Sequence, residues 1–281
     1  MRNHMTITTF IMLGLTDDPQ LQVLLFNLSL TYVLSITGNL TIIILTVVDP
    51  HLKIPMYLFL RKFSFLEVSF TTVYITRFLY SLSTENNIIT YNAYACQIFF
   101  VILFEATEFF LLAAMSYDCF AAICKPLHYM TIMNNRVCIL LVFSCWVSGW
   151  MIIVPALSLG LQLEFCDSNT VDHFKCDASP LLKTSCSDTW VIEQMIILVA
   201  VFALIITLFC VILSYIHIIK TIVRFPSAQQ RKKAFSTCSS HMIMVSMIYG
   251  SCTVIYIKPS AKEEVTINKG VSVLMTSVAP F

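Results

Sequence analysis

The chain has 281 residues, of which 58% are hydrophobic and 12% charged, and its mean hydropathy is +0.82. This is more apolar surface than one soluble core could hide, so the composition excludes an ordinary soluble domain and favours a membrane protein. The formal net charge of +1 gives no sign of a nucleic-acid partner or an acidic substrate.

Long apolar stretches predict where the chain crosses the membrane, because a helix needs about 20 residues to span about 30 Å of hydrocarbon. Six complete spans are predicted, at Val23–Val48, Tyr57–Leu82, Cys96–Ile123, Cys138–Leu161, Gln194–Val223 and Thr237–Ile257. A seventh stretch begins near Asn268 and stops at Phe281, where it has risen only about 21 Å at roughly 1.5 Å per residue. The sequence therefore predicts an all-α membrane protein whose seventh helix is truncated. Residues 1–22 are predicted to form an extracellular N-terminal tail and residues 23–281 the helical domain, with the first span acting as a signal anchor.

The charged residues indicate the orientation, because Lys and Arg collect on the cytoplasmic side of a membrane protein. With the N-terminus outside, the acidic residues of the inner segments are Asp49 and Asp118, whereas acidic residues predominate in the outer segments. The basic inner residues are Lys53, Arg61, Lys62, Lys125, Arg136, Lys220, Arg224, Arg231, Lys232 and Lys233. We predict a multi-pass plasma-membrane protein with its N-terminus outside.

Function has to be inferred from local motifs, because transporters also have many spans. The motifs are Gly38-Asn39, Pro55–Leu60, Met115–Tyr129, Trp146, Ser214-Tyr215 and Lys233–His241, in this order along the chain. Together they resemble the motifs of the olfactory receptors, a family of rhodopsin-like (class A) G-protein-coupled receptors. The resemblance implies a seven-transmembrane-helix receptor bundle that binds a small, hydrophobic, volatile odorant and signals through a stimulatory olfactory-type G protein. It implies no enzyme chemistry.

The resemblance places the coupling surface at the inner ends of the third and sixth helices. Its candidate residues are Asp118, Cys119, Lys125, Pro126, Lys232 and Lys233. The basic segment from Lys220 to Lys233 is expected to contribute to this surface, although the same lysines are also explained by topology alone. Position 119 departs from the family, which carries an arginine there, and an uncharged thiol cannot replace a guanidinium that pairs with Asp118. We therefore expect impaired coupling.

The ligand pocket is placed by the same resemblance, near the outer halves of helices 3, 5 and 6. Its candidate residues are Val101, Ile102, Glu105, Val199, Ala200, Ala203, Tyr249, Cys252, Thr253 and Tyr256. A mostly apolar lining with a few polar groups suits a small hydrophobic ligand. For each residue, helix packing is the alternative role.

Three acidic residues lie inside predicted spans, where a charge costs several kcal/mol unless it faces a polar interior. Glu67 and Glu108 occupy positions at which rhodopsin-like receptors have acidic residues proposed to hold a sodium ion, here with hydroxyls such as Ser69. The alternative is a protonated carboxyl that is hydrogen-bonded within the bundle. Glu105 lies one turn before Glu108, where the family has a small residue, so it either alters the pocket or harms the fold.

Cysteines in the long second outer loop are expected to pair, because that loop faces an oxidising environment. The family bonds the flanking pair, Cys166 with Cys186, and joins the central Cys176 to the outer end of helix 3. Here the usual helix 3 position holds Tyr94, and Cys96 follows two residues later, rotated by roughly 200°. A Cys176–Cys96 bond is the replacement that the sequence offers, and zinc binding by the loop cysteines is the weaker alternative.

Two further hypotheses concern the chain as a whole. One is a transporter or proton relay that uses the three glutamates, but it requires basic partners and broken helices that the spans lack. The other is a receptor that is retained inside the cell because of Tyr94, Glu105, Cys119 and the incomplete seventh helix.

Overall fold

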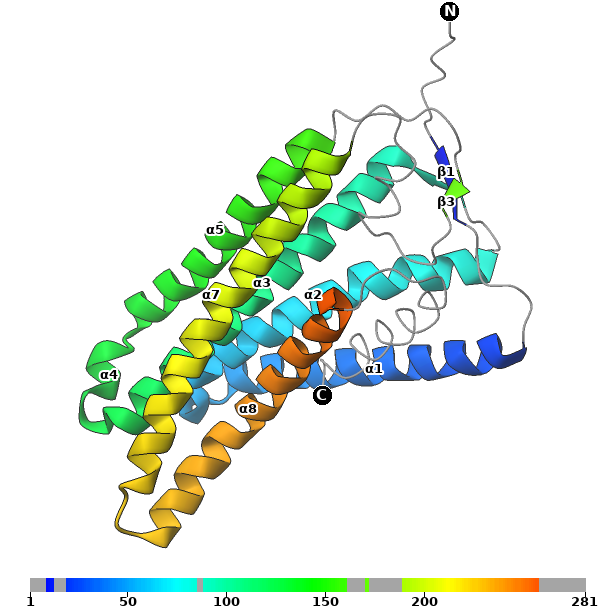
Figure 1. The fold of residues 1–281 in the computed structure, drawn as a ribbon. Coiled ribbons are helices and arrows are strands. Elements are labelled where there is room, and N and C mark those ends of the chain that lie inside the picture. Colours follow the sequence, from blue (N-terminus) through cyan, green and yellow to red (C-terminus); the bar gives the residue numbers. More distant parts are fainter. Residues whose placement is uncertain (1–8, 13–18, 85–87, 161–169, 172–188, 258–281) are drawn as a thin grey trace, which may run out of the picture. The chain divides into compact units, whose positions relative to one another are not determined.

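The computed structural model describes residues 9–12, 19–84, 88–160, 170–171 and 189–257 (Figure 1). Long helices dominate this part of the chain. They are α1 (Pro19–Val48), α2 (Pro55–Thr84), α3 (Tyr91–Cys124), α5 (Asn135–Gly160), α7 (Trp190–Val223) and α8 (Ala228–Ile257). Each of the six predicted spans is confirmed as a helix, although every one of these helices begins two to nine residues before the predicted start. The predicted seventh helix lies outside the described residues.

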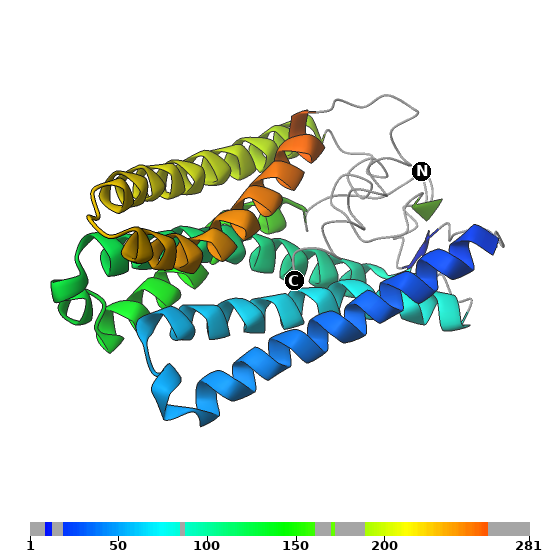
Figure 2. The same cartoon turned by 90° about the horizontal axis from the view of Figure 1, so that it is seen from below.

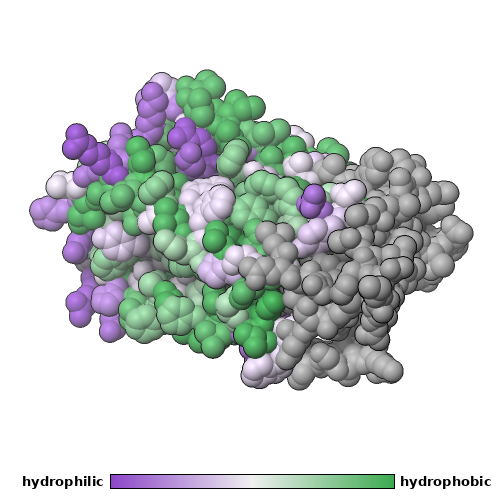
Figure 3. Space-filling model, turned by 90° about the horizontal axis from the view of Figure 1, so that it is seen from above, coloured by the Kyte–Doolittle hydropathy of each residue, from purple (hydrophilic) through white to green (hydrophobic). Residues whose placement is uncertain are grey.

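Helices are expected in this composition, because a lipid-embedded backbone must satisfy its polar groups internally. Four of the described helices meet length and hydropathy criteria for crossing a membrane: α1 over Ser29–Val48, α3, α5 and α7. Large apolar side chains are exposed along them, such as Phe143 on α5 and Phe209 on α7, which are 62% and 61% exposed. Such exposure is stable in lipid and costly in water. In the space-filling view, hydrophobic residues cover much of the described surface and hydrophilic residues gather towards its left end (Figure 3).

The helix boundaries follow from proline and capping chemistry. Pro55 is the first residue of α2, where its missing N–H removes no intrahelical hydrogen bond. The helix α3 ends at Cys124 because Pro126 disfavours helical geometry at Lys125, whose φ is −134°. Short elements follow these boundaries: the 3-10 helices η1 (Pro50–Leu52) and η2 (Pro126–His128), and the one-turn helix α4 (Tyr129–Ile132).

The described chain divides into two compact units. Unit 1 comprises residues 1–27, 69–107 and 146–204, and unit 2 comprises residues 28–68, 108–145 and 205–281. In unit 1 a small sheet pairs β1 (Thr9–Met12) antiparallel with β2 (Ile88–Thr90) and parallel with β3 (Thr170–Val171). This sheet was not predicted: Thr9–Met12, within the predicted N-terminal tail, form β1, and α1 begins four residues before the predicted start of the first span.

In unit 1 the first half of α3 packs on α5. The Phe99 and Trp150 rings meet edge to face with centroids 5.1 Å apart, and Phe104 and Trp146 do so at 6.1 Å. Between them, Gly149 approaches α3 so closely that an added Cβ would lie 2.6 Å from the Thr107 hydroxyl oxygen. This contact is apolar and tightly fitted.

In unit 2 the second half of α3 packs among α2, α7 and α8. The last part of α7 turns back into α8 through residues 224–227, and the two helices run side by side from that turn (Figures 1 and 2). Polar side chains are buried here, among them Ser64, Asp118 and His241. Unit 2 therefore contains most of the buried polar and charged side chains of the described structure.

Candidate functional site

An acidic pair lies between α2 and α3 in unit 2. Glu67 is 3% exposed, and its side chain is hydrogen-bonded to that of Glu108. Two carboxyl groups share a hydrogen bond only when one of them is protonated, so either a proton or a cation must stand between them. The structure thus brings together the two residues that the sequence proposed for an ion.

A further oxygen atom close to Glu67 in the sequence was not among those expected, and the Ser69 contribution stays a prediction. Ser69 and Glu105 belong to unit 1, and Glu105 is exposed rather than buried on the side of Glu108. Ser64 lies one turn before Glu67 on α2, is 1% exposed, and has a hydroxyl without a hydrogen-bond partner in the described structure. Among the described residues no group of three or more His, Cys, Asp or Glu could hold a metal, so a cation here would depend on hydroxyl and water oxygens.

The inner end of α3 carries Asp118, which is 2% exposed. Its carboxylate accepts a 2.9 Å hydrogen bond from the Tyr129 hydroxyl, and the same hydroxyl also interacts with the backbone of Met56. Burial, and then the nearby Asp118 carboxylate, raise the pKa of Tyr129 above its ordinary value, so its hydroxyl keeps the proton that it donates. Tyr129 is therefore the side chain that holds Asp118 in the described structure.

Cys119 meets a different partner. It is 8% exposed, and its side chain interacts electrostatically with that of Cys238 on α8, which is 1% exposed. Both cysteines are free. The residue that replaces the family arginine thus faces α8 and does not reach the surface.

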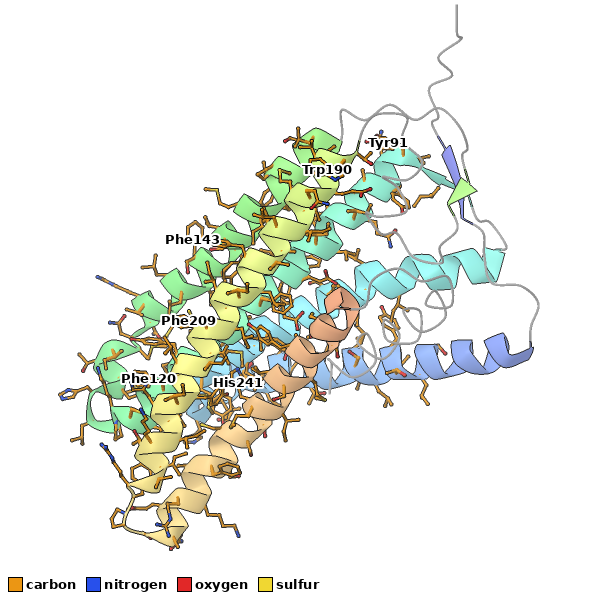
Figure 4. All side chains as sticks on the ribbon, viewed as in Figure 1. Tyr91, Phe120, Phe143, Trp190, Phe209 and His241 are labelled. Carbon is orange, nitrogen blue, oxygen red and sulfur yellow. The ribbon has the colours of Figure 1, made fainter. Side chains whose placement is uncertain are left out.

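Further contacts join α7 to α3 and α8 in unit 2. The Tyr215 hydroxyl is hydrogen-bonded to His241 Nδ1, with their rings stacked 5.9 Å apart, and the Phe120 and His217 rings meet edge to face at 5.8 Å. Figure 4 labels Phe120 and His241 in this region. Further along the same two helices, α3 and α7, Cys124 Sγ lies 3.2 Å from the Thr221 hydroxyl oxygen.

The remaining coupling candidates lie at the ends of helices. Lys125 and Lys232 are exposed, and Pro126 begins η2. The side chain of Lys233 lies outside the described part of the structure. Their exposure leaves Lys125 and Lys232 open to contact with a partner.

The pocket candidates fall into both units, and each unit is described by itself. In unit 1, Val101 and Ala203 are buried, Ile102, Val199 and Ala200 are half-buried, and Glu105 is exposed. In unit 2, Tyr249 and Cys252 are buried, and the Tyr249 ring meets Phe109 edge to face at 5.3 Å. The side chains of Thr253 and Tyr256 are not described. The pocket stays a prediction.

The outer cysteines remain equally open. Cys166, Cys176 and Cys186 lie outside the described residues, so their disulfides stay predictions. Tyr94 is fully buried whereas Cys96 is exposed and free, which agrees with the expected rotation between the two positions. The large Tyr94 ring occupies an interior position in unit 1.

Sequence reasoning missed the roles of Tyr129 and Cys238. Both residues belong to recognised motifs, but a motif does not indicate which side chains its residues will contact in the folded protein. The signal for Cys238 was the unusual thiol at position 119, because an unpaired polar substitution in a span needs a nearby partner.

Comparisons with known proteins agree on one family. The family model described as "Olfactory receptor" matches residues 28–278. Olfactory receptor 6C2 of Homo sapiens is 78% identical over 100% of this chain and 90% of its own length. Olfactory receptors 6C68 and 6C74, also of Homo sapiens, are 66% and 65% identical over the same shares.

Proposed function

The chain belongs to the olfactory receptor family, and from this premise we propose that it binds a small hydrophobic odorant and activates a stimulatory, olfactory-type G protein. The observation that carries the proposal is the family match over residues 28–278, which includes the α3 and α8 motifs. It is a membrane receptor whose apolar helices are suited to lipid, and we propose a receptor without catalytic activity. The family match leaves the transporter hypothesis without support.

We place the receptor in the plasma membrane with its N-terminus outside. Signalling follows from a shift in population: an odorant that binds the active arrangement better than the resting one moves the inner ends of α7 and α8 outward. The Tyr129–Asp118 and Tyr215–His241 contacts belong to the arrangement described here. Exposed Lys125 and Lys232 would then contact the G protein.

Coupling is weakened by the thiol at position 119. An arginine there would offer five hydrogen-bond donors and a positive charge beside Asp118, whereas Cys119 offers one weak donor and no charge. Tyr129 holds Asp118 but adds no positive charge. We therefore expect the protein to bind its odorant normally but to activate the G protein weakly.

The acidic pair also supports sodium binding. A sodium ion can replace the proton between Glu67 and Glu108 and complete its shell with waters and the Ser64 hydroxyl. Sodium chloride should then raise the thermal stability of the purified chain above that in choline chloride at equal ionic strength. Equal stability in the two salts, or the same sodium effect in Glu67→Gln, would contradict it.

The test of the main proposal compares the chain with Cys119→Arg in cells that express the stimulatory G protein. Each is tagged at the N-terminus, stained without permeabilisation, and assayed for cyclic AMP with a panel of small volatile compounds. We expect both to bind surface antibody, and Cys119→Arg to give the larger response to a shared odorant. A chain that reaches the surface, and whose Cys119→Arg form answers no compound in the panel while a related receptor does, would contradict the proposal.

A further inference from the structure

Three basic side chains gather at the turn between α7 and α8 in unit 2 (Figures 1 and 2). Lys220 lies in the last turn of α7, Arg224 follows one helical turn later, and Arg231 lies in the first turn of α8. All three side chains are exposed. The Arg231 guanidinium folds back over the turn, because its Nη1 donates a 3.3 Å hydrogen bond to the backbone carbonyl of Phe225, the residue next to Arg224.

The positive charge of this turn has no acidic counterpart along the two helices. Residues 194–257 contain no Asp and no Glu. On α3, the buried Asp118 carboxylate is held by the Tyr129 hydroxyl. Like charges one helical turn apart, such as those of Lys220 and Arg224, repel each other. An anion that carries several negative charges would therefore stabilise the turn.

The end of α7 also has an exposed apolar stripe beside the basic side chains. Its members recur at helical spacing on one face of the helix, and they are Ile212 (46% exposed), Ile216 (41%), Ile219 (48%) and Val223 (70%). Lys220 and Arg224 each directly follow a member of this stripe. With 34 residues α7 is about 51 Å long, which exceeds about 30 Å of hydrocarbon, so its end reaches the headgroup region. An acyl chain can thus lie along the stripe while its headgroup meets the basic side chains.

We propose that the turn between α7 and α8 binds a phosphoinositide, a phospholipid of the cytoplasmic leaflet whose inositol ring carries additional phosphate groups. The planar guanidinium groups of Arg224 and Arg231 bind phosphate oxygens in pairs, and Lys220 supplies a third positive charge. Polybasic segments directly next to a membrane span attract such lipids. A lipid with one net charge, such as phosphatidylserine, satisfies fewer of these donors.

This inference rests on the inner orientation of the turn, which belongs to the proposed function, because anionic lipids lie in the cytoplasmic leaflet. It goes beyond that function, since the G-protein contacts were assigned to Lys125 and Lys232. A headgroup held from both sides of the turn joins the inner ends of α7 and α8. These are the two helices whose movement we associate with signalling.

The experiment measures lipid binding by the full purified chain in detergent, without odorant or G protein. Phosphatidylinositol bisphosphate is added over a range of concentrations, and bound lipid is counted by native mass spectrometry. Phosphatidylserine at equal headgroup charge and soluble inositol trisphosphate are tested in the same way. Two double variants each remove two exposed positive charges: Lys220→Gln with Arg224→Gln at the turn, and Lys53→Gln with Arg136→Gln on other elements of unit 2.

We expect the turn variant to bind phosphatidylinositol bisphosphate about thirtyfold more weakly, because each basic residue near an anionic headgroup contributes a factor of about five. The variant of Lys53 and Arg136 should bind nearly as well as the unchanged chain, and thermal unfolding in the same detergent verifies that both variants fold. Phosphatidylserine and inositol trisphosphate should each bind more weakly than the phosphoinositide.

Four results would overturn the proposal. An unchanged chain that binds no phosphoinositide would do so, whatever the cyclic AMP assay gives. Equal losses in the two double variants, or equally tight binding of phosphatidylserine, would show a diffuse attraction to charge. Inositol trisphosphate that binds as tightly as the lipid would show a site for soluble phosphates.

Discussion

The two halves of α3 pack by different chemistry. In unit 1 the half that ends at Thr107 fits against α5 through aromatic rings and the close approach of Gly149. In unit 2 the half that begins at Glu108 meets its neighbours through a carboxyl pair, a thiol pair and a carboxylate that accepts from a tyrosine. The first half of α3 is therefore held by close steric packing. The second half is held by polar contacts that can change their partners.

The difference shows where a change of state can arise. Steric contacts between rings and a glycine have one good arrangement, because interiors are closely packed. Contacts that contain a shared proton or a tyrosine hydroxyl can be altered by a cation or a competing partner without any change in volume. We therefore expect signalling chemistry in unit 2 and mainly stability effects in unit 1.

The largest effect should come from breaking the fitted contact in unit 1. In Gly149→Ala the new Cβ meets the Thr107 hydroxyl oxygen, which is itself bound to the Leu103 carbonyl at 2.7 Å, so we expect a loss of about 3 kcal/mol. The measurement is the unfolding of the purified chain in detergent.

Two variants make this prediction specific. Gly250→Ala adds the same group where nothing lies within 4 Å and should leave stability unchanged or slightly higher. Thr107→Ala combined with Gly149→Ala removes the clashing oxygen and should recover part of the loss. A double variant no more stable than the glycine variant alone would show that the close approach to Thr107 is not the cause.

In unit 2, Glu67→Leu tests the carboxyl pair. It removes the hydrogen bond to Glu108 from a buried position and should cost about 2 kcal/mol, measured by the same unfolding assay. Glu67→Gln keeps a hydrogen-bonding group and should cost less. If leucine were the better tolerated of the two, the pair would not stabilise this part of α3.

Tyr129→Phe tests the partner of Asp118. It deletes the 2.9 Å hydrogen bond and should cost about 1.5 kcal/mol. Because the pKa of Tyr129 is raised, its hydroxyl stays protonated up to the alkaline range, and the bond's contribution is lost as the pH rises through that raised pKa. The difference in stability between the two proteins should thus be the same at pH 8 and pH 9, where the Asp118 carboxylate is ionised, and a difference that grows or shrinks over this interval would contradict the assignment.

Much of this architecture could be predicted from the sequence, because a span is a local property of about 20 apolar residues. The ends of α1 at Val48 and of α7 at Val223 were predicted to the residue. The sheet that joins β1 to β2 was not, since strand pairing depends on residues some 80 positions apart. The same limit applied to the sites: motifs indicated Glu67, Asp118 and Cys119, but the partners Tyr129 and Cys238 follow from packing that no local pattern contains.

The smallest expected effect concerns the aromatic contact in unit 1. Edge-to-face pairs add about 1 kcal/mol beyond the area that they bury, so Phe104→Leu and Trp146→Leu should be less costly together than the sum of their separate costs by about that amount. Phe104→Leu combined with Phe202→Leu is the control, because Phe202 on α7 is 63% exposed and should contribute additively. A coupling energy near zero for Phe104 and Trp146 would mean that the two rings stabilise the protein only by filling space. The first half of α3 would then be held by shape alone, and the contrast with its second half, where specific groups pair, would be sharper.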